Sequence, residues 1–105
     1  MTHSVLYITA SDMDEAKTVA RSLVEARLAA CANVIGAMES FYWWQGKLEE
    51  AREVVIIAKT RDDLVEAAVA KVREVHSYDL PCVVAVAITG GNPEFLDWIT
   101  DETAQ

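Results

Sequence analysis

Half of the chain's eight aromatic residues lie in one short stretch, Ser40-Phe41-Tyr42-Trp43-Trp44-Gln45-Gly46-Lys47. Side chains of a β-strand alternate between its two faces, so Phe41 and Trp43 point one way and Tyr42 and Trp44 the other. Both faces are then apolar, and the Gln-Gly-Lys sequence that follows favours a turn. We therefore predict a long hairpin whose aromatic side chains need cover from a partner molecule.

Hydrophobic periodicity divides the rest of the chain into short alternating elements. Capping residues and prolines mark several ends, among them Thr60 before the second helix and Pro93 at the start of the last helix. The expected elements are a strand at 5–9, a helix from 11 to about 29, strands at 32–44 and 50–60, a helix from 60 to about 75, a strand at 82–88, and a short helix after 92 with Phe95, Trp98 and Ile99 on one side.

This β-α-β-β-α-β order, with right-handed crossovers, predicts an α+β chain of the ferredoxin-like type with a short additional C-terminal helix. We expect residues 1–105 to form a single domain, because no linker or repeat interrupts them. Both main helices would lie on one face of the sheet, yet all four strands are apolar on both faces. An exposed apolar area of that size is typical of an interface, so we predict assembly through the sheets.

The bulk composition excludes several classes of function. A net charge of −8 repels phosphate backbones and argues against nucleic-acid binding. No apolar run approaches the roughly 18–20 residues that span a bilayer, and the N-terminus lacks the features of a signal peptide. Two cysteines, Cys31 and Cys82, are too few for a disulfide framework and suit a reduced cytoplasm. No catalytic triad or paired metal motif is present, so we expect a binding protein and not an enzyme.

Five segments, in order along the chain, resemble the CutA family of divalent-cation tolerance proteins. The resemblance runs from Leu6 to Ile99 and implies a compact homotrimer joined through the long hairpin, with Phe41, Tyr42, Trp43 and Trp44 at the trimer interface. It also implies a link to tolerance of copper and other divalent metals, and an architecture shared with PII-type signalling proteins. The segments are Leu28–Val34, the aromatic hairpin at 40–47, Glu53 to Thr60, His76-Ser77-Tyr78-Asp79-Leu80-Pro81, and Asn92 to Trp98.

The chain departs from the family pattern where metal is concerned. Copper binding in the family has been associated with a cysteine near the end of the first strand and a His-His pair before the tyrosine. The matching positions here are Ile8, Val75 and His76, so one ligand of three remains. The family's His-Pro-Tyr has Ser77 in place of proline, and the acid that commonly follows the loop's last proline is Cys82.

The remaining candidates for metal are His76 and Cys82, which lie close enough in sequence to meet across the loop. Each also has a structural interpretation. A histidine at a helix C-terminus is favoured as a cation by the helix dipole, and a cysteine that opens a buried strand is commonly a small core residue. Cys31 has the same structural interpretation.

A second set of candidates forms a predicted ligand cleft: Lys47, Glu53, Lys59 and Tyr78. Lys59 would lie beside the helix N-terminus at Thr60, where anions are readily held. Its alternative role is to pair with Glu53 or Asp62 at the rim of an interface.

Two functions follow from these candidates. The first is a cytoplasmic homotrimer linked to divalent-metal (copper) tolerance, which binds metal weakly or conditionally. The alternative is a PII-like sensor of small molecules, whose site lies in the cleft between subunits. Anionic metabolites are the ligands to screen for that function. A purely structural hub needs only the trimer.

Overall fold

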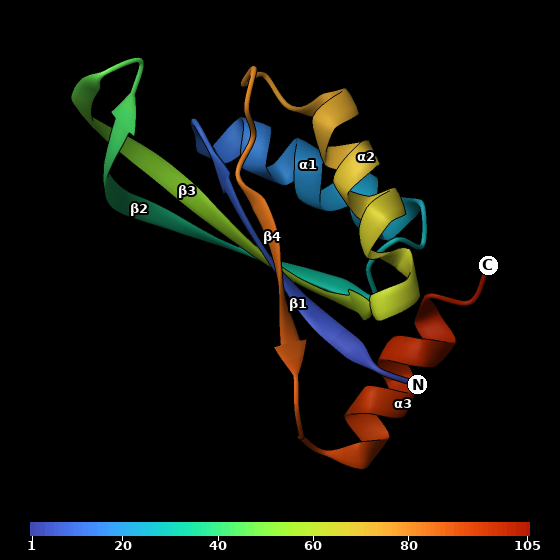
Figure 1. Ribbon diagram of the computed structural model, residues 1–105. Helices are drawn as coiled ribbons and strands as arrows, with labels where there is room; N and C mark the ends of the chain where they lie inside the picture. The colour runs from blue at the N-terminus through green and yellow to red at the C-terminus, as the bar shows by residue number, and fades with distance from the viewer.

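The predicted order of strands and helices is present in the computed structural model, which describes residues 1–105. Four strands form one antiparallel sheet in the order β2-β3-β1-β4, and helices α1 and α2 lie together on one face of it (Figure 1). The fold class is therefore confirmed as α+β and ferredoxin-like. The elements are β1 (His3–Ala10), α1 (Met13–Glu25), β2 (Cys31–Trp44), β3 (Lys47–Arg61), a 3₁₀ turn (Asp62–Leu64), α2 (Val65–Val75), β4 (Val83–Ile88) and α3 (Pro93–Glu102).

The core lies between the sheet and the two main helices. Alternate residues of β1 and β3 point toward the helices because the strand period is two. Leu6 faces Ala58 and Ile8 faces Ile56 across these strands, and all four side chains are fully buried. The remaining core side chains are Ala10, Ala16, Val19, Ala20, Leu23, Ala29, Val54, Ala68 and Val72.

Helix α1 ends at Glu25, four residues before the predicted end near Ala29. Arg27 adopts a left-handed conformation with φ of 59°, and its N–H donates to the carbonyl oxygen of Val24. The next N–H, of Leu28, donates back to the carbonyl oxygen of Leu23. These two bonds form a Schellman motif, which closes the helix without the glycine that usually signals it in a sequence.

One other predicted detail is wrong. Thr60 does not cap the second helix, because β3 continues through Arg61 and a 3₁₀ turn precedes α2. Thr60 instead lies fully buried in the sheet, and its hydroxyl oxygen has no hydrogen-bond partner. In α3, Ile99 is buried, and Phe95 and Trp98 pack against each other, consistent with the shared side of the helix predicted for them, while remaining 42% and 39% exposed.

Strands β2 and β3 continue past the rest of the sheet as the predicted hairpin (Figure 1). Its two-residue turn has positive φ at both Gln45 (50°) and Gly46 (79°), the geometry whose twist suits a tight hairpin. A bulge interrupts the pairing between Ile35 and Met38, where Ala37 has φ of 62°. The extra residue shifts the alternation of β2 by one, so every side chain after the bulge changes face.

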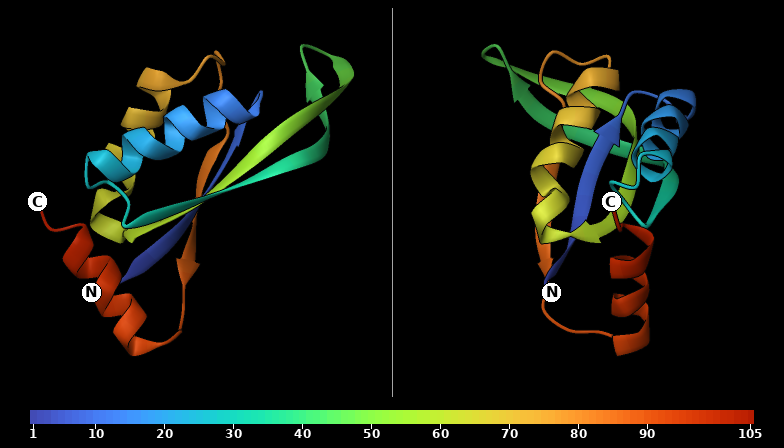
Figure 2. Two further views of the ribbon diagram at one scale, coloured as in Figure 1. Left: turned by 180° about the vertical axis from the view of Figure 1, so that it is seen from behind. Right: turned by 90° about the vertical axis from the view of Figure 1, so that its right-hand side faces the viewer.

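The face of the sheet opposite α1 and α2 carries exposed apolar side chains, as predicted. Figure 2 shows the two helices together on one side, with α3 at the end of the sheet near the N-terminus, where His3 Nε2 lies 2.8 Å from Thr100 Oγ1. The helices thus leave the opposite face without cover at Tyr7, Ile35, Val84 and Val86, which are 36–57% exposed. No helix has the length and apolar character needed to cross a membrane.

Candidate functional site

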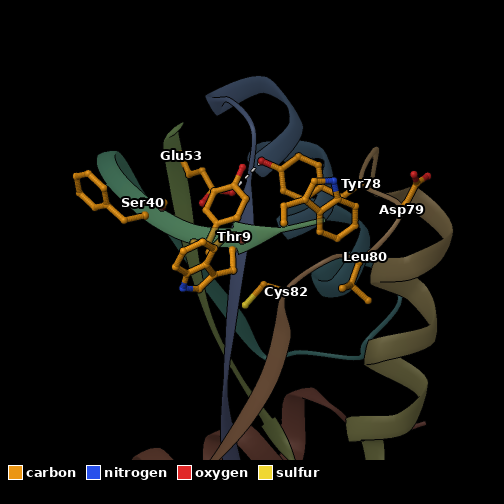
Figure 3. A pocket seen from close by; sticks show the side chains of 11 residues that line it. Thr9, Ser40, Glu53, Tyr78, Asp79, Leu80 and Cys82 are labelled. Atoms are coloured by element: carbon orange, nitrogen blue, oxygen red, sulfur yellow. Dashed lines mark hydrogen bonds between the residues drawn. The ribbon is translucent and has the colours of Figure 1, made fainter. Parts of the chain in front are cut away.

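An open pocket of about 570 Å³ lies where the projecting hairpin meets the loop between α2 and β4 (Figure 3). The end of β1 closes its floor, so three segments distant in sequence form its walls. It is lined by Thr9, Ser40, Phe41, Tyr42, Trp43, Trp44, Glu53, Tyr78, Asp79, Leu80 and Cys82. Five of these residues are aromatic, two are acidic, and none carries a positive charge.

Glu53 is the most enclosed charged group of the pocket. Its residue is only 8% exposed, and its Oε2 accepts a 2.8 Å hydrogen bond from the Tyr78 hydroxyl (Figure 3). Burial raises the pKa of Tyr78, and the hydrogen bond to Glu53 and the charge of that carboxylate raise it further. Tyr78 therefore stays protonated and holds one oxygen of the carboxylate in place.

The face of the hairpin that meets Glu53 is set by the bulge. Beyond the bulge, Met38 pairs with Glu53. Tyr42 and Trp44 follow Met38 at an even spacing along β2, so their side chains share the face of Glu53. Phe41 and Trp43 lie on the opposite face, consistent with their higher exposure of 66% and 73% against 42% and 39%. Sequence alternation predicted the two pairs correctly, but the bulge decides which pair meets the carboxylate.

His76 holds the loop on the end of β1. Its Nε2 lies 2.7 Å from the carbonyl oxygen of Thr9, and its Nδ1 accepts the N–H of Tyr78 at 3.1 Å. A backbone N–H can only donate, so Nδ1 carries no proton in this arrangement and Nε2–H donates to Thr9. The ring bridges α2, β1 and the loop, and its Nδ1 also lies 3.8 Å from Glu15 Oε1.

Glu15 ties the same loop to the start of α1. Its Oε1 accepts hydrogen bonds from the N–H and hydroxyl of Ser11, and its Oε2 accepts the N–H of Ser77 at 3.0 Å. Burial alone would raise the pKa of Glu15, but the bonds from Ser77 and Ser11 together outweigh it and lower the pKa to about 2. The carboxylate is ionised at neutral pH and fixes the backbone that presents Tyr78.

The structure brings Glu53, Tyr78 and Cys82 together in the pocket, but neither predicted lysine lines it. Lys47 lies at the tip of the hairpin, opposite Trp44. Lys59 lies at the other end of β3, where its Nζ donates to Asn33 Oδ1 at 2.9 Å. Lys59 has neither the helix N-terminus nor the carboxylate partners expected for it, because β3 continues beyond it and its pair is an amide.

The pair predicted for metal, His76 and Cys82, is not arranged as a ready site. Both ring nitrogens of His76 are occupied by hydrogen bonds, and its side chain is fully buried. Cys82 is a free, half-buried thiol at the pocket wall. No group of three or more His, Cys, Asp or Glu side chains is placed to hold an ion. A metal ion would have to displace the N–H of Tyr78 before it reached His76.

The fold and the site together define a class: a ferredoxin-like α+β chain with an overlong aromatic hairpin and an extra C-terminal helix. The chain matches the family of CutA1 divalent ion tolerance proteins over residues 4–102. It belongs to that family, and the resemblance found in its sequence motifs is confirmed.

Sequence and structural similarity to known members of the family extends over nearly the whole chain. The divalent-cation tolerance protein CutA of Archaeoglobus fulgidus is 45% identical over 103 residues, which cover 98% of this chain and 99% of that protein. A solved structure described as the periplasmic divalent cation tolerance protein CutA from Archaeoglobus fulgidus has a TM-score of 0.94 at 42% identity and covers 97% of this chain and 99% of that one. The crystal structure of CutA1 from Oryza sativa has a TM-score of 0.96 at 37% identity and covers 100% and 96%.

Proposed function

We propose that this chain acts as a cytoplasmic homotrimer in divalent-metal tolerance, assembled through the hairpin and the open face of the sheet. The observation that carries the proposal is the exposed apolar surface of the hairpin. Trp43 and Leu48 pair across its two strands on the hairpin face opposite Glu53, and they are 73% and 62% exposed. Apolar side chains clustered in this way are typical of a contact surface.

A charge placed on this surface tests the assembly. Trp43→Asp puts a carboxylate in the proposed contact without touching the core, so we expect it to lower the mass measured by light scattering from trimer to monomer. Ala67→Asp is the matched control, because it adds the same charge on an exposed position of α2. A Trp43→Asp protein that remains trimeric at low micromolar concentration would contradict the interface.

The same proposal includes weak, conditional metal binding, with the half-buried Cys82 at the pocket wall as the first ligand and His76 as a ligand only after the loop opens. The occupied nitrogens of His76 support this order. Calorimetric titration with Cu²⁺ and Zn²⁺ tests it. We expect affinities no tighter than micromolar, with copper binding lost in Cys82→Ser, and a tight site unaffected by that substitution would refute the assignment.

A specific observation favours a second function, the binding of a small molecule. The pocket beside Glu53 has the volume of a typical ligand site and mainly aromatic walls. Its lining carries only negative charge, which does not suit the anionic ligands expected from a PII-like comparison. Glu53 and Tyr78 remain its proposed polar groups, whereas Lys47 and Lys59 of one chain contribute nothing to its walls.

A further inference from the structure

We infer that the pocket beside Glu53 binds the protonated amino or guanidinium group of a small organic molecule. This inference rests on the second function proposed above and names the class of ligand. Three properties of the pocket carry it: its charge, an open carboxylate oxygen, and the aromatic side chains that share a face with that carboxylate.

The charge of the pocket is negative and uncompensated. Glu53 forms no ion pair, since no lysine, arginine or histidine nitrogen lies within 4.0 Å of its carboxylate. The other acid of the lining, Asp79, is exposed, and its carboxylate points away from the pocket (Figure 3). Buried charges in proteins are normally paired, so Glu53, a residue that is only 8% exposed and has no cation beside its carboxylate, lacks its partner.

One oxygen of Glu53 is open to receive that partner. Oε2 accepts the Tyr78 hydroxyl, whereas Oε1 accepts no hydrogen bond from the protein. The backbone N–H of Tyr78 is held by His76 Nδ1, which limits how far Tyr78 and the Glu53 carboxylate bonded to it can move. The fixed geometry leaves an acceptor site, and a charged N–H donor makes the strongest bond to a carboxylate.

The aromatic walls favour the same kind of ligand. Tyr42 and Trp44 share the face of Glu53, and Tyr78 closes the pocket from the loop. The faces of aromatic rings carry negative partial charge and attract cations within about 6 Å. The rings also cover the apolar part of an organic amine, which a hydrated metal ion lacks. The pocket therefore suits an organic cation better than an anion or a bare metal ion.

Three probes that share one apolar part and differ in charge test the inference: phenethylamine, 2-phenylethanol and 3-phenylpropionate. Each is titrated calorimetrically into the purified full-length protein at pH 7.5, where the amine is protonated. We expect saturable binding of phenethylamine, at least tenfold tighter than that of the alcohol or the carboxylate. Equal affinity for the amine and the alcohol would overturn the inference.

Glu53→Gln identifies the carboxylate as the source of selectivity. The amide keeps an oxygen for the Tyr78 hydroxyl, so the fold is preserved while the charge is removed. We expect at least a tenfold loss of affinity for phenethylamine and no change for the alcohol. Glu50→Gln is the matched control, since Glu50 lies on the opposite face of the same strand. Equal effects of the two variants, or none from either, would refute the site.

A second source of the same chemistry is a lysine or arginine side chain of another copy of this chain. In that case phenethylamine does not bind the assembled protein and Glu53→Gln lowers the assembly mass, which overturns the inference. Light scattering on the same samples separates the two proposals. A monomeric protein that binds phenethylamine refutes the proposed trimer and supports the organic-cation site. A trimeric protein that does not bind phenethylamine supports the trimer and refutes the organic-cation site.

Discussion

His76 joins three parts of the molecule through one buried ring. We expect His76→Ala to lower the free energy of unfolding by about 2–3 kcal/mol, because it leaves the carbonyl oxygen of Thr9 and the N–H of Tyr78 without partners and opens a cavity. Urea unfolding monitored by circular dichroism measures this loss. A loss below about 0.5 kcal/mol would show that the two bonds do not hold the loop.

The stability that Glu15 contributes by holding the loop depends on pH. Its folded pKa of about 2 lies below the ordinary 4.5, so its contribution to stability is complete above pH 4.5 and is lost as the pH falls toward 2. The side chain is 14% exposed, and allowing for screening by water we expect roughly 1–2 kcal/mol to disappear across that range. Urea unfolding of Glu15→Gln should show a flatter acid limb than the wild type, and parallel curves would contradict the role of Glu15.

The sequence indicated Glu53 and Tyr78 as site residues because each falls in a motif of the family, and Cys82 because it follows the same loop closely enough to meet His76. It did not reveal what holds them. The His76–Thr9 bond joins residues 67 positions apart, and the Ser77–Glu15 bond joins residues 62 apart. Local patterns carry no information about such pairs. The same reason explains the error over Lys59, whose partner Asn33 is brought to it only by the register of β2 and β3.

Among the elements, the hairpin turn depends on its two left-handed residues. Gly46 has φ of 79° and open space around it, so Gly46→Ala tests backbone strain alone, at about 1–2 kcal/mol of lost stability. Gln45→Asn is the matched opposite change, since asparagine tolerates φ of 50° better than glutamine, and we expect a gain of a few tenths of a kcal/mol. Urea midpoints of the two variants should move in opposite directions, and a shift of both in one direction would contradict the turn.

The bulge of β2 is the element that alternation alone could not foresee. Gly36 stands beside it, and a Cβ there would come within 2.9 Å of the Met13 methyl group. Gly36 was therefore the available signal of a close approach or a bulge. A glycine in a strand has several structural meanings, however, so the sequence alone did not fix the shift that places Tyr42 and Trp44 beside the pocket.

At the scale of the whole molecule, the chain is too extended for its length. Its surface of 6500 Å² exceeds the roughly 5,800 Å² expected for a monomer of 11.6 kDa. Its radius of gyration of 14.1 Å likewise exceeds the roughly 13 Å expected of 105 residues, and its longest dimension is 44 Å. The projecting hairpin accounts for this shape, because residues 47–53 of β3 pair with β2 alone. A two-stranded ribbon is only marginally stable in water by itself.

An assembly that supplies the missing contacts makes stability depend on protein concentration. For a folded trimer in equilibrium with three unfolded chains, each tenfold dilution removes about 2.7 kcal/mol per trimer. We expect the urea midpoint to fall by roughly 0.5–1 M per tenfold dilution. Trp43→Asp should have a lower midpoint that does not change with dilution, because its contact surface is lost. A wild-type midpoint that stays constant over a hundredfold range of concentration would show that the extended hairpin is stable without a partner.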